Sequence, residues 1–314
     1  MDNKPTPKKS SKKSGTVRKI CFAAGGATLA AITAASVALA SSVTRIKPQT
    51  LGYALAWQKD HYDISWFSGL RKKKYTVTSE DGYRLHVVLC ENPNGGNKYV
   101  IFSHGYTDNR YGDLKYMKIY LDRGYNCVIY DLRGHGENEP ARCTYSCREA
   151  EDLYALIQDT RKRFGQRIIL GLHGESLGAA VTAAVMKYHP HVDFAVCDCG
   201  FADIENVIRG GMKEKHIPQF LYYTTSLACR ICYGYFFGQM KPIRSLEDCD
   251  VPMLFIHGGE DKFITPDNSL RMRREVKGYS EYHQIAGAGH AESVLRQPQR
   301  YREIVNSFLD TIEC

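Results

Sequence analysis

The fold is decided by the stretch Ile168-Ile-Leu-Gly-Leu-His-Gly-Glu-Ser-Leu-Gly-Ala-Ala180. Its first part is a run of apolar, branched residues, which is typical of a buried strand. The run stops at a Gly-x-Ser-x-Gly pentapeptide centred on Ser176, and a small-residue segment that favours a helix follows. So sharp a turn lifts the serine side chain clear of the sheet, to a helix N-terminus where free N–H groups favour negative charge. Gly174 and Gly178 are needed because a side chain at either position would collide with the neighbouring strand or helix.

The positive charge of the chain is concentrated at its start. Residues 1–19 carry seven basic residues against one aspartate, a net of +6, which leaves +2 of the formal +8 for the rest of the 314 residues. This balance gives no reason to expect nucleic-acid binding by the domain. The Lys-, Ser- and Pro-rich tail is too polar to bury, so we expect residues 1–19 to be a disordered cytoplasmic tail.

Residues 20–44 contain no charged side chain. As a helix rising about 1.5 Å per residue, they are long enough to cross a hydrocarbon core of about 30 Å. We interpret the segment as an uncleaved transmembrane anchor, with the basic tail in the cytoplasm and the domain outside the cell membrane. A signal peptide cleaved near Ala40, which would give a secreted protein, is the alternative. An Ala-rich soluble helix is a further reading.

Residues 45–72 form a juxtamembrane connector rich in aromatic side chains. We expect these side chains to cover one edge of the domain, although a position at the bilayer interface is the alternative. The basic run Arg71–Lys74 is most simply a solvated turn, and contact with anionic lipid headgroups is the alternative. The aromatic residues concerned are Tyr53, Trp57, Tyr62, Trp66 and Phe67.

Strand and helix patterns alternate through residues 73–314 and predict a doubly wound, mostly parallel sheet of the α/β class that opens with an antiparallel hairpin. Besides the strand before Ser176, the predicted strands are Tyr75–Thr78, Arg84–Leu89, Lys98–Ser103, Cys127–Tyr130, Asp193–Cys197, Val251–Gly259 and Glu281–Ile285. The predicted helices are Asp113–Arg123, Arg148–Phe164, Leu177–Tyr188, Asn268–Val276 and Pro298–Ile312.

The alternation breaks at about residues 201–250, where aromatic and aliphatic residues occur without a strand pattern. Inserted after the sixth strand, this segment is predicted to form a small helical lid over Ser176. Its apolar side chains would then line an acyl pocket, or simply pack on the sheet.

Acyl transfer by a serine needs a base, an acid that orients the base, and donors for the oxyanion. Asp261 and His290 follow Ser176 in the order acid then base, and each comes just after a predicted strand. Because parallel strands end at one edge of the sheet, we expect the three side chains to meet there. Glu260 is the rival acid, and we expect it to face solvent.

Four other histidines lie at strand ends or in turns near this edge. We expect all four to hydrogen-bond neighbouring loops rather than to act as bases. They are His104, His135, His173 and His257.

Five motifs resemble the alpha/beta-hydrolase superfamily, and the resemblance covers residues 75–312. It is most similar to bacterial serine-aminopeptidase-like and esterase-like hydrolases that carry an N-terminal membrane anchor. It implies that the backbone N–H groups of Tyr106 and Leu177 form the oxyanion hole. The motifs are His104-Gly-Tyr-Thr, Asp131-Leu-Arg-Gly-His-Gly, Gly174-Glu-Ser-Leu-Gly-Ala, His257-Gly-Gly-Glu-Asp-Lys-Phe-Ile-Thr-Pro and Gly287-Ala-Gly-His-Ala.

The sequence therefore predicts a serine hydrolase that cleaves a carboxylic ester or a related acyl bond. The alternatives are a peptidase specific for free N-termini, with Glu205, Glu214 or Glu247 holding the ammonium group, and a non-catalytic, membrane-anchored binding module. The serine at the elbow disfavours dehalogenase chemistry, which uses an aspartate nucleophile. We expect a monomer acting on a small acyl ester or peptide.

Eleven cysteines leave one or two disulfides possible, and Cys143–Cys147 is the first pair to test. No pair of Cys-x-x-Cys motifs occurs, so a structural zinc site is not expected. The chemistry requires neither a metal nor a cofactor.

Overall fold

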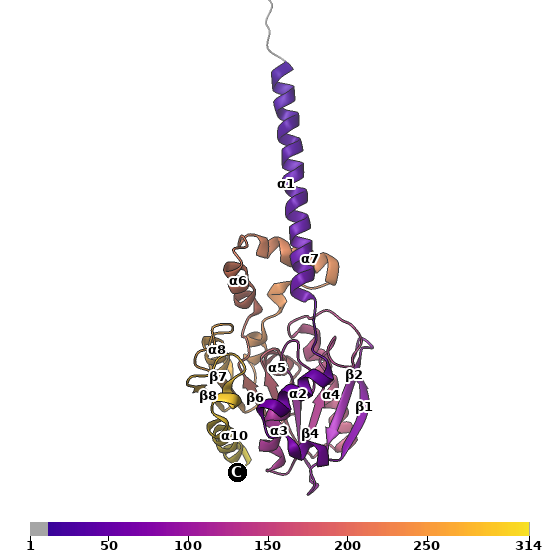
Figure 1. The fold of residues 1–314 in the computed structure, drawn as a ribbon, viewed down its shortest axis with the longest axis vertical. Helices are drawn as coiled ribbons and strands as arrows, with labels where there is room; N and C mark the ends of the chain where they lie inside the picture. The colour runs from indigo at the N-terminus through magenta and orange to yellow at the C-terminus, as the bar shows by residue number, and fades with distance from the viewer. Residues whose placement is uncertain (1–11, 314) are drawn as a thin grey trace, which may run out of the picture.

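An eight-stranded sheet organises the computed structural model, which describes residues 12–313, with side chains from residue 25 onward (Figure 1). The strand order is β1-β2-β4-β3-β5-β6-β7-β8, and all neighbours from β4 to β8 are parallel. The two pairings of β2 are antiparallel, which confirms the predicted opening hairpin. The strands are β1 Lys72–Thr78, β2 Arg84–Cys90, β3 Lys98–Ser103, β4 Tyr125–Tyr130, β5 Ile169–Glu175, β6 Phe194–Asp198, β7 Met253–Gly258 and β8 Ser280–Ile285.

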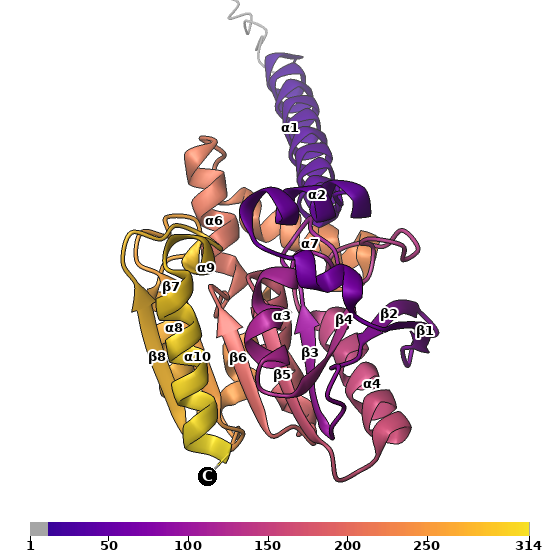
Figure 2. The same ribbon diagram turned by 60° about the horizontal axis from the view of Figure 1, so that its bottom comes forward.

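Helices cover both faces of the sheet, and each face has its own apolar core. The helices α4 (Cys147–Phe164), α5 (Leu177–Ala184) and α8 (Asp267–Glu275) contribute to one core. The helices α3 (Leu114–Leu121) and α10 (Pro298–Glu313) contribute to the other, and Figure 2 shows them in front of the sheet. Every residue of β4 and of β7 is buried, because central parallel strands are covered on both sides.

The basic run at residues 71–74 is not the turn that we expected. Lys72, Lys73 and Lys74 are exposed residues of β1, the edge strand. Lysines on an exposed edge discourage pairing with another sheet, so the charge is compatible with a strand at this position.

The connector contains a helix that the sequence analysis missed, α2 (Leu51–His61), followed by the 3-10 turn η1 (Ser65–Gly69). Thr50 caps α2 by accepting a hydrogen bond from the N–H of Tyr53, at 3.2 Å. The aromatic side chains of the connector differ in burial. Phe67 is buried in the core with α3, whereas the ring of Tyr53 is exposed.

Helix α1 (Lys12–Thr44) projects from the body of the molecule (Figure 1). It begins eight residues before the predicted start at Ile20, so the disorder expected for residues 12–19 is wrong. Adding residues to an existing helix costs little, and lysine and serine are compatible with one. The rest of the tail, residues 1–11, lies outside the described residues. The stretch Gly25–Thr44 is apolar and long enough to span a membrane, and a signal sequence would share these properties.

The residues between β6 and β7 form helices, as predicted for the lid. These are α6 (Ile204–Glu214), α7 (Leu221–Tyr233) and the 3-10 turns η3 (Phe237–Gln239) and η4 (Pro242–Leu246). Both α6 and α7 lie at the end of the body from which α1 projects (Figures 1 and 2). We call residues 201–250 the insert.

Cys143 and Cys147, the first pair to test for a disulfide, are not bridged in the structure. Both are free thiols, and so are all nine cysteines whose side chains lie within the described residues. Seven of those nine are buried, where the thiol packs as a small apolar side chain.

Candidate active site

The turn between β5 and α5 has the strained geometry that the pentapeptide predicts. Ser176 has φ 53° and ψ −111°, a region that non-glycine residues rarely occupy. A Cβ atom on Gly178 would lie 1.8 Å from the carbonyl oxygen of Ser103, and one on Gly174 would lie 2.3 Å from that of Gly178. Both clashes involve backbone atoms, so neither glycine can be replaced without moving a strand or a helix.

Three residues from distant parts of the chain meet at this turn. The Oγ atom of Ser176 lies 2.8 Å from Nε2 of His290, and Nδ1 of His290 lies 2.6 Å from Oδ2 of Asp261. Asp261 follows β7 and His290 follows β8, so both come from the edge of the sheet where β5 ends. The contact with Asp261 fixes the proton on Nδ1, which leaves Nε2 to accept a hydrogen bond from the serine hydroxyl.

The environment of Asp261 holds it ionised. Burial by itself would raise its pKa, but hydrogen bonds from His257 and His290 outweigh burial and lower the pKa of the carboxyl group. Its other oxygen accepts the N–H groups of Phe263 and Ile264, each at 2.9 Å. The neighbouring Glu260 is exposed, as expected.

The other histidines are held by hydrogen bonds inside the fold. Burial lowers the pKa of His104 to about 4 and the pKa values of His135 and His173 to about 3, so all three are neutral near pH 7. His173 contacts two tyrosine hydroxyls at 2.9 and 3.2 Å. His257 contacts Oδ2 of Asp261 at 3.2 Å, so it supports the acid and not the serine.

The loop after β3 runs beside the serine, where the oxyanion hole is expected. A Cβ atom on Gly105 would lie 3.7 Å from the Cβ atom of Ser176. Tyr106 and Leu177 line the same cavity as Ser176. The two residues expected to supply the N–H donors are thus adjacent to the serine, and the donor role remains a prediction.

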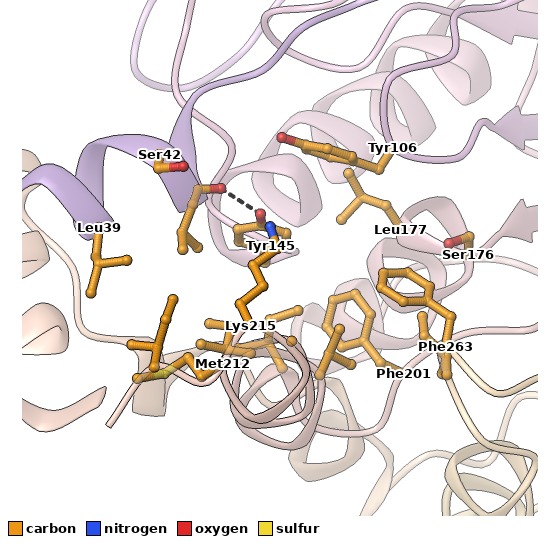
Figure 3. Close-up of a pocket in the computed structure, with 17 residues that line it drawn as sticks. Leu39, Ser42, Tyr106, Tyr145, Ser176, Leu177, Phe201, Met212, Lys215 and Phe263 are labelled. Atoms are coloured by element: carbon orange, nitrogen blue, oxygen red, sulfur yellow. Dashed lines mark hydrogen bonds between the residues drawn. The ribbon is translucent and has the colours of Figure 1, made fainter. Parts of the chain in front are cut away.

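An apolar cavity of about 330 Å³ adjoins the serine (Figure 3). Its lining comes from the sheet edge, from the insert and, unexpectedly, from α1. In Figure 3, Ser176 and Leu39 lie at opposite ends of the labelled residues. The aliphatic and aromatic lining residues are Leu39, Val43, Tyr106, Tyr145, Leu177, Phe201, Ile204, Val207, Ile208, Met212, Ile217, Phe263 and Ile264.

The C-terminal end of α1 is packed into the body. Ser36, Ala40 and Thr44 lie four residues apart on one face of the helix, and all are buried. The helix-end carbonyl groups are satisfied by the domain: Tyr145 donates its hydroxyl to Val43 at 2.5 Å, and the N–H of Cys143 donates to Thr44 at 2.9 Å. Nothing in an Ala-rich apolar run indicated that it would form one wall of a cavity.

A buried ion pair lies behind the serine. Lys115 of α3 pairs with Glu175, the residue before Ser176, and both side chains are less than a tenth exposed. Burial alone would lower the pKa of Lys115, but the attraction of Glu175 outweighs it and raises the pKa of this lysine. Tyr116 donates its hydroxyl to Glu175 at 2.5 Å and also contacts Asp198 at 3.0 Å.

Replacing Lys115 by methionine should destabilise the fold by about 3–5 kcal/mol, because Glu175 would be left buried and unpaired. Lys118→Met on the same helix is the matched control. Lys118 is 44 % exposed and pairs with Asp122 at the surface, so its loss should cost less than about 1 kcal/mol. Urea unfolding measures both, and equal midpoints for the two variants would show that the buried pair adds no stability.

Asp198→Asn should change how stability depends on pH between about pH 4 and pH 6. Burial, with the charge of Glu175, raises the pKa of Asp198 from 3.8 to about 6. In that window the folded protein holds a proton that the unfolded chain releases, so the wild type loses stability as pH rises. Asparagine has no such proton. Relative to the wild type, the free energy of unfolding of the variant should therefore rise by about 3 kcal/mol between pH 4 and pH 6. Above about pH 6 the difference should stay constant. An offset in unfolding free energy that stays constant with pH would contradict this.

No group of three or more His, Cys, Asp or Glu side chains among residues 25–313 is arranged to hold a metal ion. The chemistry available at this edge is that of a serine hydroxyl, an imidazole and a carboxylate.

Comparisons with known proteins agree with this fold. Residues 98–213 match the sequence family described as the alpha/beta hydrolase fold. The uncharacterized protein YqkD of Bacillus subtilis is 27 % identical over 305 residues, which cover 94 % of this chain and 98 % of that protein. A (R)-3-hydroxydecanoyl-ACP:CoA transacylase of Pseudomonas aeruginosa is 20 % identical over 255 residues, which cover 70 % of this chain and 84 % of that protein.

Among solved structures, the esterase Pf2001 of Pyrococcus furiosus superposes with a TM-score of 0.65 at 19 % identity. The superposition covers 85 % of this chain and 98 % of that one, and at this identity it shows a shared fold. The chain therefore has the alpha/beta-hydrolase fold, and its residues 98–213 match the family that is described by this fold. The family match includes Ser176 and ends before Asp261 and His290.

Proposed function

We propose that the protein is a serine hydrolase that cleaves carboxylic esters of apolar acyl groups through an acyl-enzyme. The proposal rests above all on the hydrogen-bonded series Ser176–His290–Asp261, with contacts of 2.8 and 2.6 Å. These are the distances over which a base can take the serine proton and a carboxylate can orient the base.

Nucleophilic attack begins when Nε2 of His290 takes the hydroxyl proton of Ser176 while Oγ attacks the ester carbonyl carbon. The N–H groups of Tyr106 and Leu177 stabilise the negative oxygen of the tetrahedral intermediate. His290 then protonates the departing alcohol, and the acyl group stays on the serine. Water, deprotonated by the same imidazole, releases the carboxylic acid and restores the hydroxyl. Asp261 stays ionised throughout and stabilises the positive charge on His290.

The lining of the cavity favours an apolar acyl group. It contains one ionisable amine, Lys215, and no carboxylate. A peptidase specific for free N-termini would need an acidic group to hold the ammonium, and a lysine would repel it. Of the acidic candidates, Glu205 pairs with Arg209 at 2.8 Å, while Glu214 and Glu247 are exposed. These observations favour the ester over the peptide, and the intact triad geometry argues against a non-catalytic binding module.

The packing of α1 supports an uncleaved anchor. Cleavage near Ala40 would remove a residue that is fully buried and would also remove Leu39 from the cavity. We therefore propose a single-pass membrane protein with its basic N-terminus in the cytoplasm and its hydrolase domain outside.

A series of p-nitrophenyl esters of increasing acyl length, assayed beside aminoacyl anilides, tests the substrate class. We expect kcat/KM to rise from acetate to medium-length acyl groups, with negligible cleavage of anilides, because each buried methylene adds about 0.8 kcal/mol of binding. Cleavage of anilides without cleavage of esters would favour the peptidase instead.

Met212→Trp should shorten the preferred acyl chain. Met212 is buried on α6 and lines the cavity, so a larger side chain would occupy the space of the distal methylenes. We expect kcat/KM for medium-length esters to fall about tenfold while the acetate ester is little affected. Glu214→Trp, an exposed position on the same helix, is the control and should leave the chain-length profile unchanged. A profile that Met212→Trp does not alter would show that acyl groups bind elsewhere.

A further inference from the structure

Helix α7 exposes a row of large apolar side chains on one face. The spacing of these residues by three or four places them in a single stripe along the helix. Its opposite face is buried, through residues such as Leu221 and Cys229. The members of the stripe are Phe220, Tyr223, Leu227 and Ile231, which are 53, 66, 52 and 75 % exposed. We call these four residues the α7 stripe.

The α7 stripe belongs to a helix that packs against α1. Ser36 of α1 donates a hydrogen bond to Thr224 of α7 at 2.7 Å, and α7 crosses beside the lower part of α1 (Figure 1). The helix that carries the stripe therefore touches the segment long and apolar enough to cross a membrane. An exposed apolar row beside such a segment would lie next to the membrane that the segment crosses.

Helix geometry fixes the depth at which α7 would lie. The uncharged run of α1 starts at Ile20, and Ser36 is its seventeenth residue. The sixteen residues before Ser36 span about 24 Å, which is shorter than a hydrocarbon core of about 30 Å. An uncharged span of the full length of about 30 Å would therefore include the part of α1 that α7 flanks. The α7 helix then sits at the boundary between hydrocarbon and headgroups.

The cavity extends to the same depth along α1 as the helix α7. Leu39 lies about 28 Å along the helix from Ile20, so it falls near the end of the hydrocarbon span. Leu39 and Val43 line the cavity that begins at Ser176 (Figure 3). An acyl chain held with its ester carbonyl at the serine would thus extend toward the membrane boundary.

We propose that the α7 stripe rests in the leaflet of the bilayer next to the domain, and that the cavity takes its substrates, amphiphilic fatty-acyl esters, from this leaflet. The second part of this inference rests on the proposed function. The reaction is hydrolysis: water supplies the oxygen of the released fatty acid and the proton of the released alcohol. The charges on α7 fit such a surface, because Arg230 is the single charged residue of the helix and is exposed.

Lipid contact is tested by tryptophan quenching in the full-length protein, reconstituted into phosphatidylcholine vesicles. The emission that Leu227→Trp adds to that of the unsubstituted protein should fall at least twofold when the lipids carry brominated acyl chains. Tyr279→Trp is the control, since Tyr279 is 46 % exposed beside Phe308 of α10, away from α1 and α7, and its added emission should not change. Equal responses at the two positions would overturn the docking, as would burial of the stripe against a second copy, detected by cross-linking.

Substrate delivery is tested with the double variant Leu227→Gln/Ile231→Gln, whose positions are exposed and do not line the cavity. Hydrolysis of a long-chain monoacylglycerol held in the vesicles should fall at least tenfold, while hydrolysis of water-soluble p-nitrophenyl butyrate should stay within twofold. A loss that is the same for both esters, or no loss for either, would overturn the inference and leave the proposed function intact. If the wild type hydrolyses neither ester, the proposed function fails, and the quenching result alone decides whether the stripe contacts lipid.

Discussion

Replacing Ser176 by alanine should lower kcat for ester hydrolysis by about 10⁶-fold. The hydroxyl is the nucleophile in the proposed mechanism, and no other hydroxyl contacts His290 in the described part of the chain. Without it, water would have to attack the bound ester with help from the oxyanion donors alone. KM should change little, because the acyl group binds in the cavity and not to the serine oxygen. Steady-state kinetics with a medium-length p-nitrophenyl ester measures both quantities.

Ser42→Ala is the matched control for this loss. Ser42 lines the same cavity from α1. Its substitution therefore removes a serine hydroxyl from the cavity and leaves the contact between Ser176 and His290 intact. Its kcat should remain within about threefold of the wild type. A Ser176→Ala protein that retains more than about a hundredth of the wild-type kcat would mean that another group attacks the ester.

Asp261→Asn should lower kcat by about 10⁴-fold. The carboxylate accepts the Nδ1 proton of His290 at 2.6 Å, and this contact leaves Nε2 free to accept from the serine. An amide donates as readily as it accepts, so it allows the other tautomer, in which Nε2 carries the proton and cannot serve as a base. The lowered pKa of Asp261 also shows that its surroundings favour the negative charge, and asparagine would not supply that charge.

Glu260→Gln is the control for this prediction, since it removes the neighbouring acid, which is exposed. Its effect on kcat should be less than about threefold. A large loss with Glu260→Gln, together with a small one for Asp261→Asn, would transfer the role of the acid to Glu260.

The sheet and the meeting of Ser176, Asp261 and His290 at one edge could be predicted from the sequence, because each depends on local patterns. Central strands such as β4 and β7 are continuous apolar runs, and parallel strands end at a common edge. A serine, an aspartate and a histidine placed just after three such runs must therefore lie near one another. Because these side chains are short and the turns that carry them are tight, the distances between the three side chains can vary little.

The wall that α1 adds to the cavity could not be predicted from the sequence, because it depends on packing between distant segments. The buried row Ser36, Ala40 and Thr44 is a set of small residues at intervals of four, which permits close approach to another helix. In an alanine-rich segment such spacing occurs by composition alone, so it gave no signal. The ion pair between Lys115 and Glu175 joins residues sixty positions apart, and nothing near Lys115 indicates its partner.

The claim that Ser176 is an activated nucleophile is tested most directly by an active-site-directed fluorophosphonate, with the site of attachment mapped by mass spectrometry. The proposed mechanism predicts a single adduct on the peptide that contains Ser176, absent in Ser176→Ala and formed much more slowly in Asp261→Asn. An adduct on a different residue, or labelling of Ser176→Ala at the wild-type rate, would contradict it.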